Sequence, residues 1–378
     1  MSKILYLFDA GDWESRMEVA HGARQAGFDV VIGLINGDES TAAKAPDFKI
    51  IPLRKASAQI GVVSTLKFIA AMRMLIRAER PDIIHVVTLK YSFMAGVASL
   101  WIGYDMRKIF TMAGLGYVFR SDAVKSKILR CALSPFLKFT FRRPRTTLIF
   151  QNKDDLNLCV NGGYVRSENA VLIKGSGVYL DRFAPDDGVR DDPPVILMPT
   201  RLVHEKGVAI FVEAARILKA RGVNAVFQIA GGETTHNPKA ISKDEMISMV
   251  ADGAAQWLGR VEDLPTRLAR STMVVYPSYY GEGIPRVLLE ACAASKAIVT
   301  TDHPGCREAV QDGVNGRLVH VKDAMATADA IEYILSHPKE RAAMEHASRE
   351  RAEKEFDIHH IAHHTIAVYG ACKKHSQN

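Results

Sequence analysis

The sequence predicts an α/β protein built on two parallel sheets. Short apolar runs rich in Val, Ile and Phe alternate with segments of helical periodicity, a pattern typical of strands that helices bury on both faces. A Pro-, Gly- and Asp-rich stretch at residues 184–194 interrupts the alternation, which then restarts. The 378 residues are also more than one hydrophobic core usually supports. We therefore expect two Rossmann-like domains joined by a linker at 184–194.

The first domain is expected at residues 1–183. Its strands should be Ile4–Phe8, Val30–Leu34, Ile83–Val87, Ile109–Thr111 and Leu148–Phe150. The first run is too short for a signal peptide, because its apolar character stops at Asp9. The longest other apolar stretch, at residues 93–104, is shorter than the ~20 residues that a membrane-spanning helix needs. No transmembrane segment is expected.

The second domain is expected at residues 195–340. Its strands should be Val195–Met198, Ala225–Ala230, Met273–Tyr276, Ala297–Thr300 and Gly316–Val319, with a helix over Val208–Arg221. Residues 341–378 are helical in pattern, rich in charge and followed by no strand. We expect this C-terminal helix to return to the first domain.

Composition narrows the class of partner and compartment. The formal net charge of +7 favours anionic partners such as nucleotides, nucleic acid or acidic lipid headgroups. The five cysteines are scattered and form no C-x-x-C pair, so neither a disulfide framework nor a zinc site is indicated. A cytoplasmic, reducing environment fits this composition.

Two cations follow the first strand of the second domain. In the segment from Pro199 to Gly207, Arg201 and Lys206 stand between a strand end and a helix start. Ligands of open α/β sheets bind at the carboxyl ends of the strands, and cations beside a helix N-terminus suit a diphosphate. A pair of solvated surface cations is the alternative that this motif alone leaves open.

An acidic turn follows a later strand of the same domain. The segment from Tyr276 to Glu290 carries Glu282 between two glycines, and Glu290 lies about two helical turns beyond it. Carboxylates accept hydrogen bonds from sugar hydroxyls and from a ribose diol, and Gly281 and Gly283 allow the backbone to approach a ligand closely. A helix-capping role for Glu282 is the alternative.

Taken together, these motifs resemble glycosyltransferase family 4, the retaining transferases of GT-B fold with two Rossmann-like domains facing a cleft. The resemblance extends over nearly the whole chain and is strongest to a bacterial capsule and O-antigen branch that includes polyprenyl-diphosphate-saccharide N-acetylgalactosaminyltransferases. The segments that carry it are Ile149–Asp155, Gly175–Val178, Asp181–Phe183, Gly283–Glu290 and Pro304–Glu308, beside Arg201, Lys206 and Glu282.

The resemblance implies roles for residues of the second domain. Lys206 and Arg201 would neutralise the donor diphosphate, Glu282 would contact the transferred sugar, and Glu290 would bind the ribose. The backbone at Gly283, Ile284 and Pro285 would hold the sugar and diphosphate. The loop of Gly259, Arg260, Val261 and Glu262 would lie at the edge of the base. The donor it implies is a UDP-sugar, with UDP-N-acetylgalactosamine as the first expectation.

The resemblance also implies acceptor-binding residues in the first domain. They are Gly11, Arg16, Lys90 and Gly114, with Arg16 facing the cleft; each cation has an ordinary surface role as its alternative. Many relatives have a histidine where this chain has Ala113. The role of that histidine therefore has no counterpart here, and His85 is expected to pack beside its strand.

Metal is not expected in the site. The chain has no Asp-x-Asp pair of the kind that holds magnesium or manganese on a diphosphate, so protein cations would neutralise that group. His359, His360, His363 and His364 have helical spacing that also suits zinc, but a polar helix face explains them better. No cofactor other than the nucleotide-sugar substrate is expected.

A basic segment points to a membrane surface. Residues 101–145 contain ten basic and two acidic residues with apolar residues interleaved, a pattern of helices that lie on anionic membranes. No nucleic-acid motif accompanies the charge. We expect a peripheral enzyme on the inner face of the cytoplasmic membrane that acts on a lipid-linked acceptor; core packing of the aromatic residues is the alternative.

Two other classes of function stay open at this point. A nucleotide-sugar epimerase or hydrolase of the same fold would share the second domain but needs acid and base residues in the first. A non-catalytic nucleotide-sugar or membrane-binding module would bind donor without turnover. A Rossmann dehydrogenase is disfavoured, because no Gly-x-Gly-x-x-Gly follows the first strand.

Overall fold

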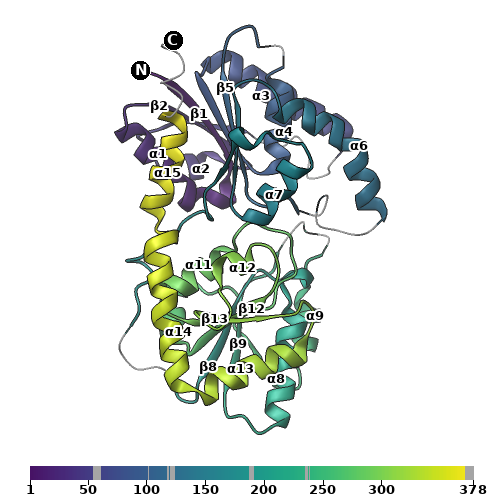
Figure 1. The fold of residues 1–378 in the computed structure, drawn as a ribbon, viewed down its shortest axis with the longest axis vertical. Helices are drawn as coiled ribbons and strands as arrows, with labels where there is room; N and C mark the ends of the chain where they lie inside the picture. Colours follow the sequence, from purple (N-terminus) through teal and green to yellow (C-terminus); the bar gives the residue numbers. More distant parts are fainter. Residues whose placement is uncertain are drawn as a thin grey trace. The chain divides into compact units, whose positions relative to one another are not determined.

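The chain folds into two compact units. The computed structural model describes residues 1–53, 61–100, 102–116, 119, 124–186, 191–234, 237 and 239–370. The first unit comprises Met1–Ser176 together with the chain from Ile358 onward, and the second comprises Gly177–Asp357 (Figure 1). Each unit has its own sheet and its own core.

The first unit is a parallel sheet in the order β3-β2-β1-β4-β5-β6-β7. Its strands are β1 (Lys3–Asp9), β2 (Asp29–Ile35), β3 (Lys49–Leu53), β4 (Ile83–Val87), β5 (Arg107–Met112), β6 (Thr146–Phe150) and β7 (Ala170–Leu172). The central strands are apolar on both faces because helices cover both. The order reverses between β1 and β4, so the ends of these two strands flank the position where open sheets bind ligands.

Helices cover the two faces of this sheet in separate groups. One face packs against α3 (Val62–Glu79), α4 (Leu89–Ala98), α6 (Val124–Phe141) and α7 (Lys153–Asn161). The other packs against α1 (Trp13–Gln25) and α15 (Ile358–Gly370), which lie side by side although they come from opposite ends of the sequence (Figure 1). The short α2 (Glu39–Ala42) precedes β3.

The second unit is a parallel sheet in the order β10-β9-β8-β11-β12-β13. Its strands are β8 (Val195–Pro199), β9 (Val226–Ala230), β10 (Gln256–Trp257), β11 (Met273–Tyr276), β12 (Ala297–Thr301) and β13 (Gly316–Val319). The order reverses between β8 and β11. The loops that carry Lys206 and Glu282 follow these two strands, so both residues lie at the reversal point.

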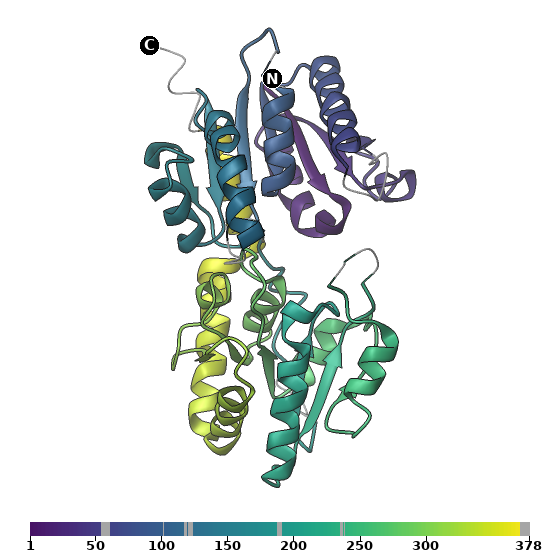
Figure 2. The same cartoon turned by 90° about the vertical axis from the view of Figure 1, so that its right-hand side faces the viewer.

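Helices also cover both faces of the second sheet (Figure 2). One core contains side chains of α8 (Val208–Ala220), α9 (Lys243–Met249), α13 (Ala324–Ser336) and α14 (Pro338–Arg351). The other contains those of α10 (Leu264–Arg270), α11 (Arg286–Ala293) and α12 (Cys306–Ala309). Each unit has the parallel, helix-covered sheet of a Rossmann-like domain, as the sequence predicted.

The boundaries of the units differ from those expected. The first unit ends at Ser176 rather than at residue 183, because Val178 and Phe183 pack into the core around α11. The expected linker at 184–194 therefore lies within the second unit, and its residues 187–190 fall outside the described part of the chain.

The C-terminal region is divided between the units. We expected all of 341–378 to return to the first domain, but residues up to Asp357 belong to the second. Arg349 explains part of this: its guanidinium Nη1 donates to the carbonyls of Leu180 at 3.1 Å and Ala293 at 2.7 Å. Only α15 belongs to the first unit, and residues 371–378 lie outside the described range.

Candidate active site

The loops after β8 and β11 approach each other because of one glycine. Gly207 ends the short 3₁₀ turn His204–Lys206 with φ of 82°, and a Cβ there would lie 2.2 Å from the carbonyl oxygen of Pro277. Only glycine accepts both the left-handed conformation and this contact. The close approach brings Lys206 against the loop that begins at Pro277.

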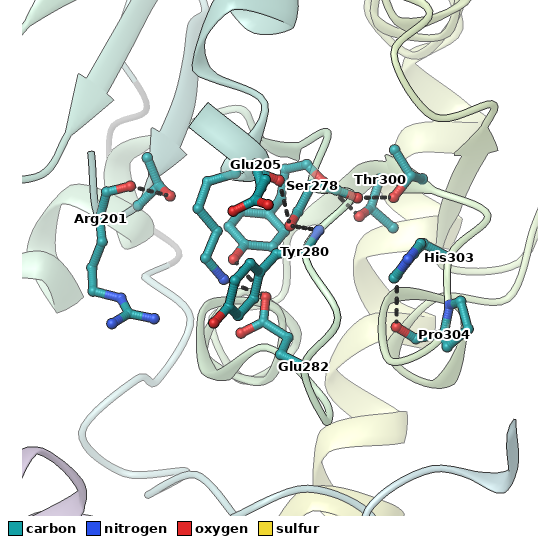
Figure 3. Close-up of polar contacts among 12 residues, drawn as sticks. Arg201, Glu205, Ser278, Tyr280, Glu282, Thr300, His303 and Pro304 are labelled. Atoms are coloured by element: carbon teal, nitrogen blue, oxygen red, sulfur yellow. Dashed lines mark hydrogen bonds and ion pairs between the residues drawn. The ribbon is translucent and has the colours of Figure 1, made fainter. Parts of the chain in front are cut away.

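Hydrogen bonds hold the two loops together. The carbonyl of Glu205 accepts from the backbone N–H of Tyr279 at 2.9 Å and from the hydroxyl of Ser278 at 3.3 Å. The hydroxyl of Thr300, on β12, donates to the carbonyl of Tyr276 at 2.7 Å. Figure 3 shows these contacts from Glu205, Ser278 and Thr300 around the turn that leads to Glu282. The backbone around the site is therefore fixed by its own hydrogen bonds.

Lys206 and Glu282 form an ion pair at the centre of this region. The Lys206 ammonium donates to Glu282 Oε1; the Lys206 side chain is 3% exposed and that of Glu282 is 21% exposed. The hydroxyl of Tyr276 donates to the same oxygen at 3.1 Å. The ammonium lies 5.4 Å from the ring centroid of Tyr276 and 4.8 Å from that of Tyr280. A buried cation is thus held between two aromatic rings and one carboxylate.

Tyr276 remains a proton donor in this setting. Burial raises its pKa well above the ordinary range, and the negative charge of Glu282 raises it further. Its hydroxyl therefore stays protonated at any physiological pH and supports the orientation of Glu282.

Close contact between two glycines shapes the loop after Glu282. Gly305 has φ of 88°, and a Cβ on it would lie 1.8 Å from the carbonyl oxygen of Gly283. Gly283, Ile284 and Pro285 are buried, and α11 begins directly after them at Arg286. The candidate donor-binding backbone is therefore packed on the loop before α12.

Glu290 lies further along α11. Its side chain is 12% exposed, and Oε1 is 3.6 Å from Nη2 of Arg286, one helical turn earlier. Its carboxylate therefore keeps limited access to solvent in the second turn of α11, the helix that follows the glycine loop.

Arg201 stands apart from the ion pair. Its side chain is exposed, and Figure 3 shows it away from Tyr280 and Glu282. Within the described part of the chain, no hydrogen bond or ion pair involves its guanidinium. The structure thus brings Lys206 and Glu282 together and leaves Arg201 at the end of β8, open to solvent.

The loops after β8, β9 and β10 are tied to one another. A Cβ on Gly231 would lie 1.7 Å from the Thr200 carbonyl oxygen, so this position needs glycine. The N–H of Gly231 donates to the carbonyl of Gly259 at 2.8 Å. Arg260 and Glu262 are exposed and Val261 is half-buried. The expected base-edge loop therefore lies at the same sheet edge as Arg201.

The acceptor candidates of the first unit follow three adjacent strands. Gly11 follows β1 and is exposed, Lys90 is half-buried in the first turn of α4, and Gly114 follows β5 with φ of 105°. Lys90 Nζ lies 5.9 Å from the ring centroid of Tyr91. Ala113 is half-buried beside Gly114. These residues share the edge at which the strand order reverses.

Arg16 is nearly buried in α1 rather than open to solvent. It is 6% exposed, and its Nε has no hydrogen-bond partner among the described residues. Its charge acts on the groups packed beneath it. Burial and, to a lesser extent, the positive charge of Arg16 lower the pKa of His85 to about 3.

His85 packs within the core, as predicted. It lies in β4 with Nδ1 2.6 Å from the Tyr369 hydroxyl and Nε2 2.7 Å from the Thr111 hydroxyl. Its ring stacks on that of Tyr6 with centroids 4.6 Å apart. His85 is neutral and structural, and it links β4 to α15.

The basic segment includes α6, which has a row of exposed apolar residues. An exposed stripe at helical spacing runs along it through Ile128, Ala132, Pro135, Phe136 and Phe139. Leu137 and Phe141 face the core instead. Some of the aromatic residues are thus core, but Phe136 is 61% exposed and Phe139 56%.

Cations flank this stripe. Lys127 and Arg142 are exposed, whereas Arg130 and Lys138 are half-buried. Arg130 donates to the Phe119 carbonyl at 2.9 Å. Arg120 and the side chain of Lys125 fall outside the described residues. No helix in the described ranges combines the length and apolarity needed to cross a bilayer.

The remaining histidines form no metal site in the part of the chain that is described. No group of three or more His, Cys, Asp or Glu residues there could hold an ion. His359 Nδ1 lies 2.9 Å from a carboxylate oxygen of Glu18 on α1.

The sequence did not indicate that Tyr276 and Tyr280 enclose Lys206, nor that Thr88 has a strained backbone conformation. The two tyrosines flank the quoted turn around Glu282, but only the fold shows that their rings enclose Lys206. Thr88 precedes α4 with φ of 78° and ψ of 145°, a region that β-branched residues rarely adopt. No pattern in the sequence indicates this strained residue.

Two family models match the chain. Residues 181–351 match glycosyl transferases group 1, and residues 3–152 match the glycosyl transferase 4-like model. The two matches fall in the second and first unit.

Relatives match over nearly the whole length. The chain is 26% identical over 355 residues to the N,N'-diacetylbacillosaminyl-diphospho-undecaprenol alpha-1,3-N-acetylgalactosaminyltransferase of Campylobacter jejuni, covering 90% of this chain and 91% of the relative. It is 23% identical to the capsular polysaccharide biosynthesis glycosyltransferase CapM of Staphylococcus aureus, covering 94% and 93%. The fold matches that of HepE from Anabaena, solved in complex with UDP and glucose, with a TM-score of 0.76, 18% identity and coverage of 98% and 100%.

Proposed function

The second unit matches the glycosyl transferases group 1 model and the first matches the glycosyl transferase 4-like model. We propose that the chain moves a hexose or N-acetylhexosamine from a UDP-sugar to a lipid-linked, polyprenyl-diphosphate saccharide with retention of configuration. The observation that carries this proposal is the Lys206–Glu282 pair at the reversal point of the second sheet. It offers a cation for a diphosphate and a carboxylate for sugar hydroxyls side by side.

The proposed reaction needs charge stabilisation more than a nucleophile. The bond from the anomeric carbon to the diphosphate oxygen breaks, and the acceptor hydroxyl oxygen bonds to the same face of that carbon. Its proton passes to the leaving diphosphate oxygen. Lys206 and Arg201 stabilise the charge that develops on the diphosphate, without a metal ion. In this account Arg201 is solvent-exposed until the donor arrives.

The rest of the donor extends along the same sheet edge. Glu290 binds the ribose hydroxyls, and the backbone at Gly283, Ile284 and Pro285 holds the sugar and diphosphate. The loop of Gly259, Arg260 and Val261 borders the base. The burial of the glycine loop and its contact with Gly305 support a fixed backbone there.

Similarity supports the choice of sugar and acceptor. The Campylobacter relative is named as an N-acetylgalactosaminyltransferase acting on a diphospho-undecaprenol saccharide, and the other relative is named for capsular polysaccharide biosynthesis. We take N-acetylgalactosamine as the first candidate sugar and surface polysaccharide or glycan assembly as the setting. UDP, bound in the HepE structure, is the first candidate nucleotide.

The acceptor is proposed to bind the first unit. Gly11, Lys90 and Gly114 share the edge where its strand order reverses, and Arg16 lies in the first turn of α1, the helix that follows Gly11. Lys90 and Arg16 are cations suited to phosphate. A buried guanidinium with an unpaired Nε supports the choice of Arg16.

An assay of radiolabelled sugar transfer tests the proposed function. Purified chain is incubated with a panel of radiolabelled nucleotide sugars and a polyprenyl-diphosphate saccharide, and the label is extracted with the lipid. Transfer from a UDP-sugar to the lipid is expected. Release of free sugar without acceptor, or donor binding without any turnover, would contradict the proposal.

We also propose that α6 holds the enzyme on the cytoplasmic face of an anionic membrane. An apolar stripe flanked by cations suits the boundary between headgroups and acyl chains. Each cation near such a surface contributes about 1 kcal/mol.

Vesicle co-sedimentation tests this docking. Changing Arg130, Lys138, Arg142 and Arg143 together to Ser should weaken binding to phosphatidylglycerol vesicles by orders of magnitude at low salt. High salt should remove most of the difference. Equal binding by variant and wild type, or no binding by wild type, would leave a transferase without this surface.

A further inference from the structure

A hollow of about 430 Å³ lies at the amino-terminal edge of the first sheet, the edge opposite to Gly11, Lys90 and Gly114. The side chains that matter for its chemistry are those of Leu100, Tyr104, Asp105, Lys108, Arg143 and Arg145. It adjoins the C-terminal end of α6 and takes no part in the proposed transfer reaction.

Positive charge in the hollow exceeds negative charge. Arg145 is ion-paired with Asp105, which is the only acidic residue of the lining among the described residues. Among the described residues, the Lys108 ammonium donates only to the Met106 carbonyl, at 3.3 Å. Partial burial lowers the pKa of Lys108, and the neighbouring Arg143 lowers it further. An anion in the hollow would relieve this uncompensated charge.

The backbone is strained where it forms the hollow. Arg145 has φ of 55°, a left-handed conformation that non-glycine residues adopt at a cost in free energy. Its carbonyl accepts from the N–H of Lys108 at 2.9 Å, so the same turn fixes the two cationic residues next to each other. Glycine would form this turn more easily, yet the sequence has an arginine there.

The hollow adjoins exposed aromatic side chains. The Arg143 guanidinium lies 5.0 Å from the ring centroid of Phe139, and Phe139 and Phe136 end the apolar stripe of α6. A ligand that fits both features has a phosphate group next to an apolar chain. This combination is the chemistry of an anionic phospholipid.

We propose that this hollow binds the phosphate group of an anionic phospholipid, with Lys108, Arg143 and Arg145 donating to its oxygens and Phe136 and Phe139 lying against the acyl chains. The inference extends the membrane docking proposed for α6 from a nonspecific surface to a defined headgroup site. It is independent of the donor site around Lys206.

The test measures binding of dihexanoyl phosphatidylglycerol, kept below its micelle concentration, to the full-length chain by calorimetry. Lys108→Gln with Arg143→Gln should bind at least about tenfold more weakly, because two charge-assisted hydrogen bonds are lost. Lys44→Gln with Arg166→Gln removes the same charge from exposed positions of the first unit and should change affinity less than about twofold. Equal weakening in both pairs, or in neither, would overturn the proposal.

A second variant distinguishes loss of the lipid site from loss of folding. Arg145→Gly suits the left-handed backbone, so it should keep or raise the melting temperature while weakening lipid binding. Inorganic phosphate is the parallel probe: if it binds as tightly as the phospholipid, the hollow is a site for free phosphate and the lipid assignment is wrong.

Sugar transfer to a water-soluble acceptor analogue should be unchanged in all these variants. A failure of the lipid site therefore leaves the transferase assignment untouched. A failure of transfer by wild type would equally leave the lipid measurement valid.

Discussion

Lys206 is the residue on which the proposed donor site depends most directly. A cation that is 3% exposed needs an anionic partner, because burying an unpaired charge is costly. Glu282 is that partner here. A donor diphosphate would compete for the same ammonium and leave Glu282 free to accept from sugar hydroxyls. The pair thus links donor binding to the position of the sugar.

Replacing Lys206 tests this role. Lys206→Met keeps most of the side-chain volume and should lower turnover at saturating donor by ~10²–10³, since one charge stabiliser of the leaving group is lost. Lys219→Met, which changes an exposed cation of α8, should leave turnover unchanged. Turnover is measured at saturating UDP-sugar, with thermal unfolding to establish folding. Wild-type turnover in the Lys206 variant would show that the site is elsewhere.

Thr88 is a strained residue that directly follows β4, the strand beside the reversal point of the first sheet. Its φ of 78° is accessible to glycine at little cost, whereas threonine pays roughly 1–3 kcal/mol. Thr88→Gly should therefore raise the free energy of unfolding by about 1 kcal/mol, after the added flexibility of the unfolded chain is subtracted. Thr88→Ala keeps a Cβ and should give no comparable gain. Denaturant unfolding measures both, and equal stability of the glycine variant and wild type would show that the conformation carries no strain.

At the scale of elements, α15 completes the core of the first unit. Tyr369 is buried and its hydroxyl contacts His85 of β4, while the guanidinium of Arg107 donates to the Tyr369 carbonyl at 3.0 Å. Because β4 is central in the sheet, this helix contributes to the stability of the whole unit.

The His85 contact makes stability depend on pH. The pKa of His85 is about 3 in the folded state and about 6.5 in an unfolded chain, so the unfolded state binds its proton first as pH falls. The contribution of neutral His85 to the free energy of unfolding is complete above pH ~6.5. It is lost as pH falls from there toward 3, at up to ~1.4 kcal/mol per pH unit. Unfolding free energies of wild type and His85→Gln should therefore converge in acid. Parallel curves between pH 7 and 4 would contradict a buried neutral histidine.

The apolar stripe of α6 gives a second prediction at this scale. Ile128, Phe136 and Phe139 are exposed, so changing all three to Ser removes little packing from the core. Binding to phosphatidylglycerol vesicles should fall strongly, since each buried side chain contributes ~1.5–3 kcal/mol. Val62, Val63 and Leu66, exposed on α3, changed to Ser serve as the matched control. Co-sedimentation measures both; equal loss would mean that α6 has no special part in docking.

Some elements could be predicted from the sequence and others could not. Strands buried on both faces, such as β8 and β11, appear as uninterrupted apolar runs. β3, β7 and β10 were missed: β3 contains a proline and is only half-buried, and β7 and β10 have only a few residues. The division of the C-terminal region at Asp357 depends on packing against α11, which no periodicity reveals.

The same contrast holds for the candidate site. Arg201, Lys206 and Glu282 were expected at strand ends because local sequence places them after apolar runs. The enclosure of Lys206 by Tyr276 and Tyr280 depends on two loops meeting, which in turn depends on Gly207 lying against Pro277. The burial of Arg16 likewise depends on which face of α1 meets the sheet.

At the scale of the whole molecule, each unit offers a reversal point at the carboxyl edge of its sheet. That of the second unit carries the cation and carboxylate proposed for the donor, and that of the first carries the residues proposed for the acceptor. The hydrogen bond from the Tyr279 N–H to the Glu205 carbonyl holds together the two loops that carry Lys206 and Glu282. We propose that these protein groups suffice, without a metal ion, for transfer from a nucleotide sugar.

The most direct test is transfer of radiolabel from UDP-N-acetylgalactosamine to a polyprenyl-diphosphate saccharide in excess EDTA, with wild type beside Glu282→Gln. The amide keeps the size of the side chain but not the charge that faces Lys206. We predict that wild type keeps its transfer activity under chelation and that the transfer rate of the variant is lower by a factor of ~10²–10³. Loss of wild-type activity in EDTA that manganese restores, or full activity in the Glu282 variant, would contradict the account.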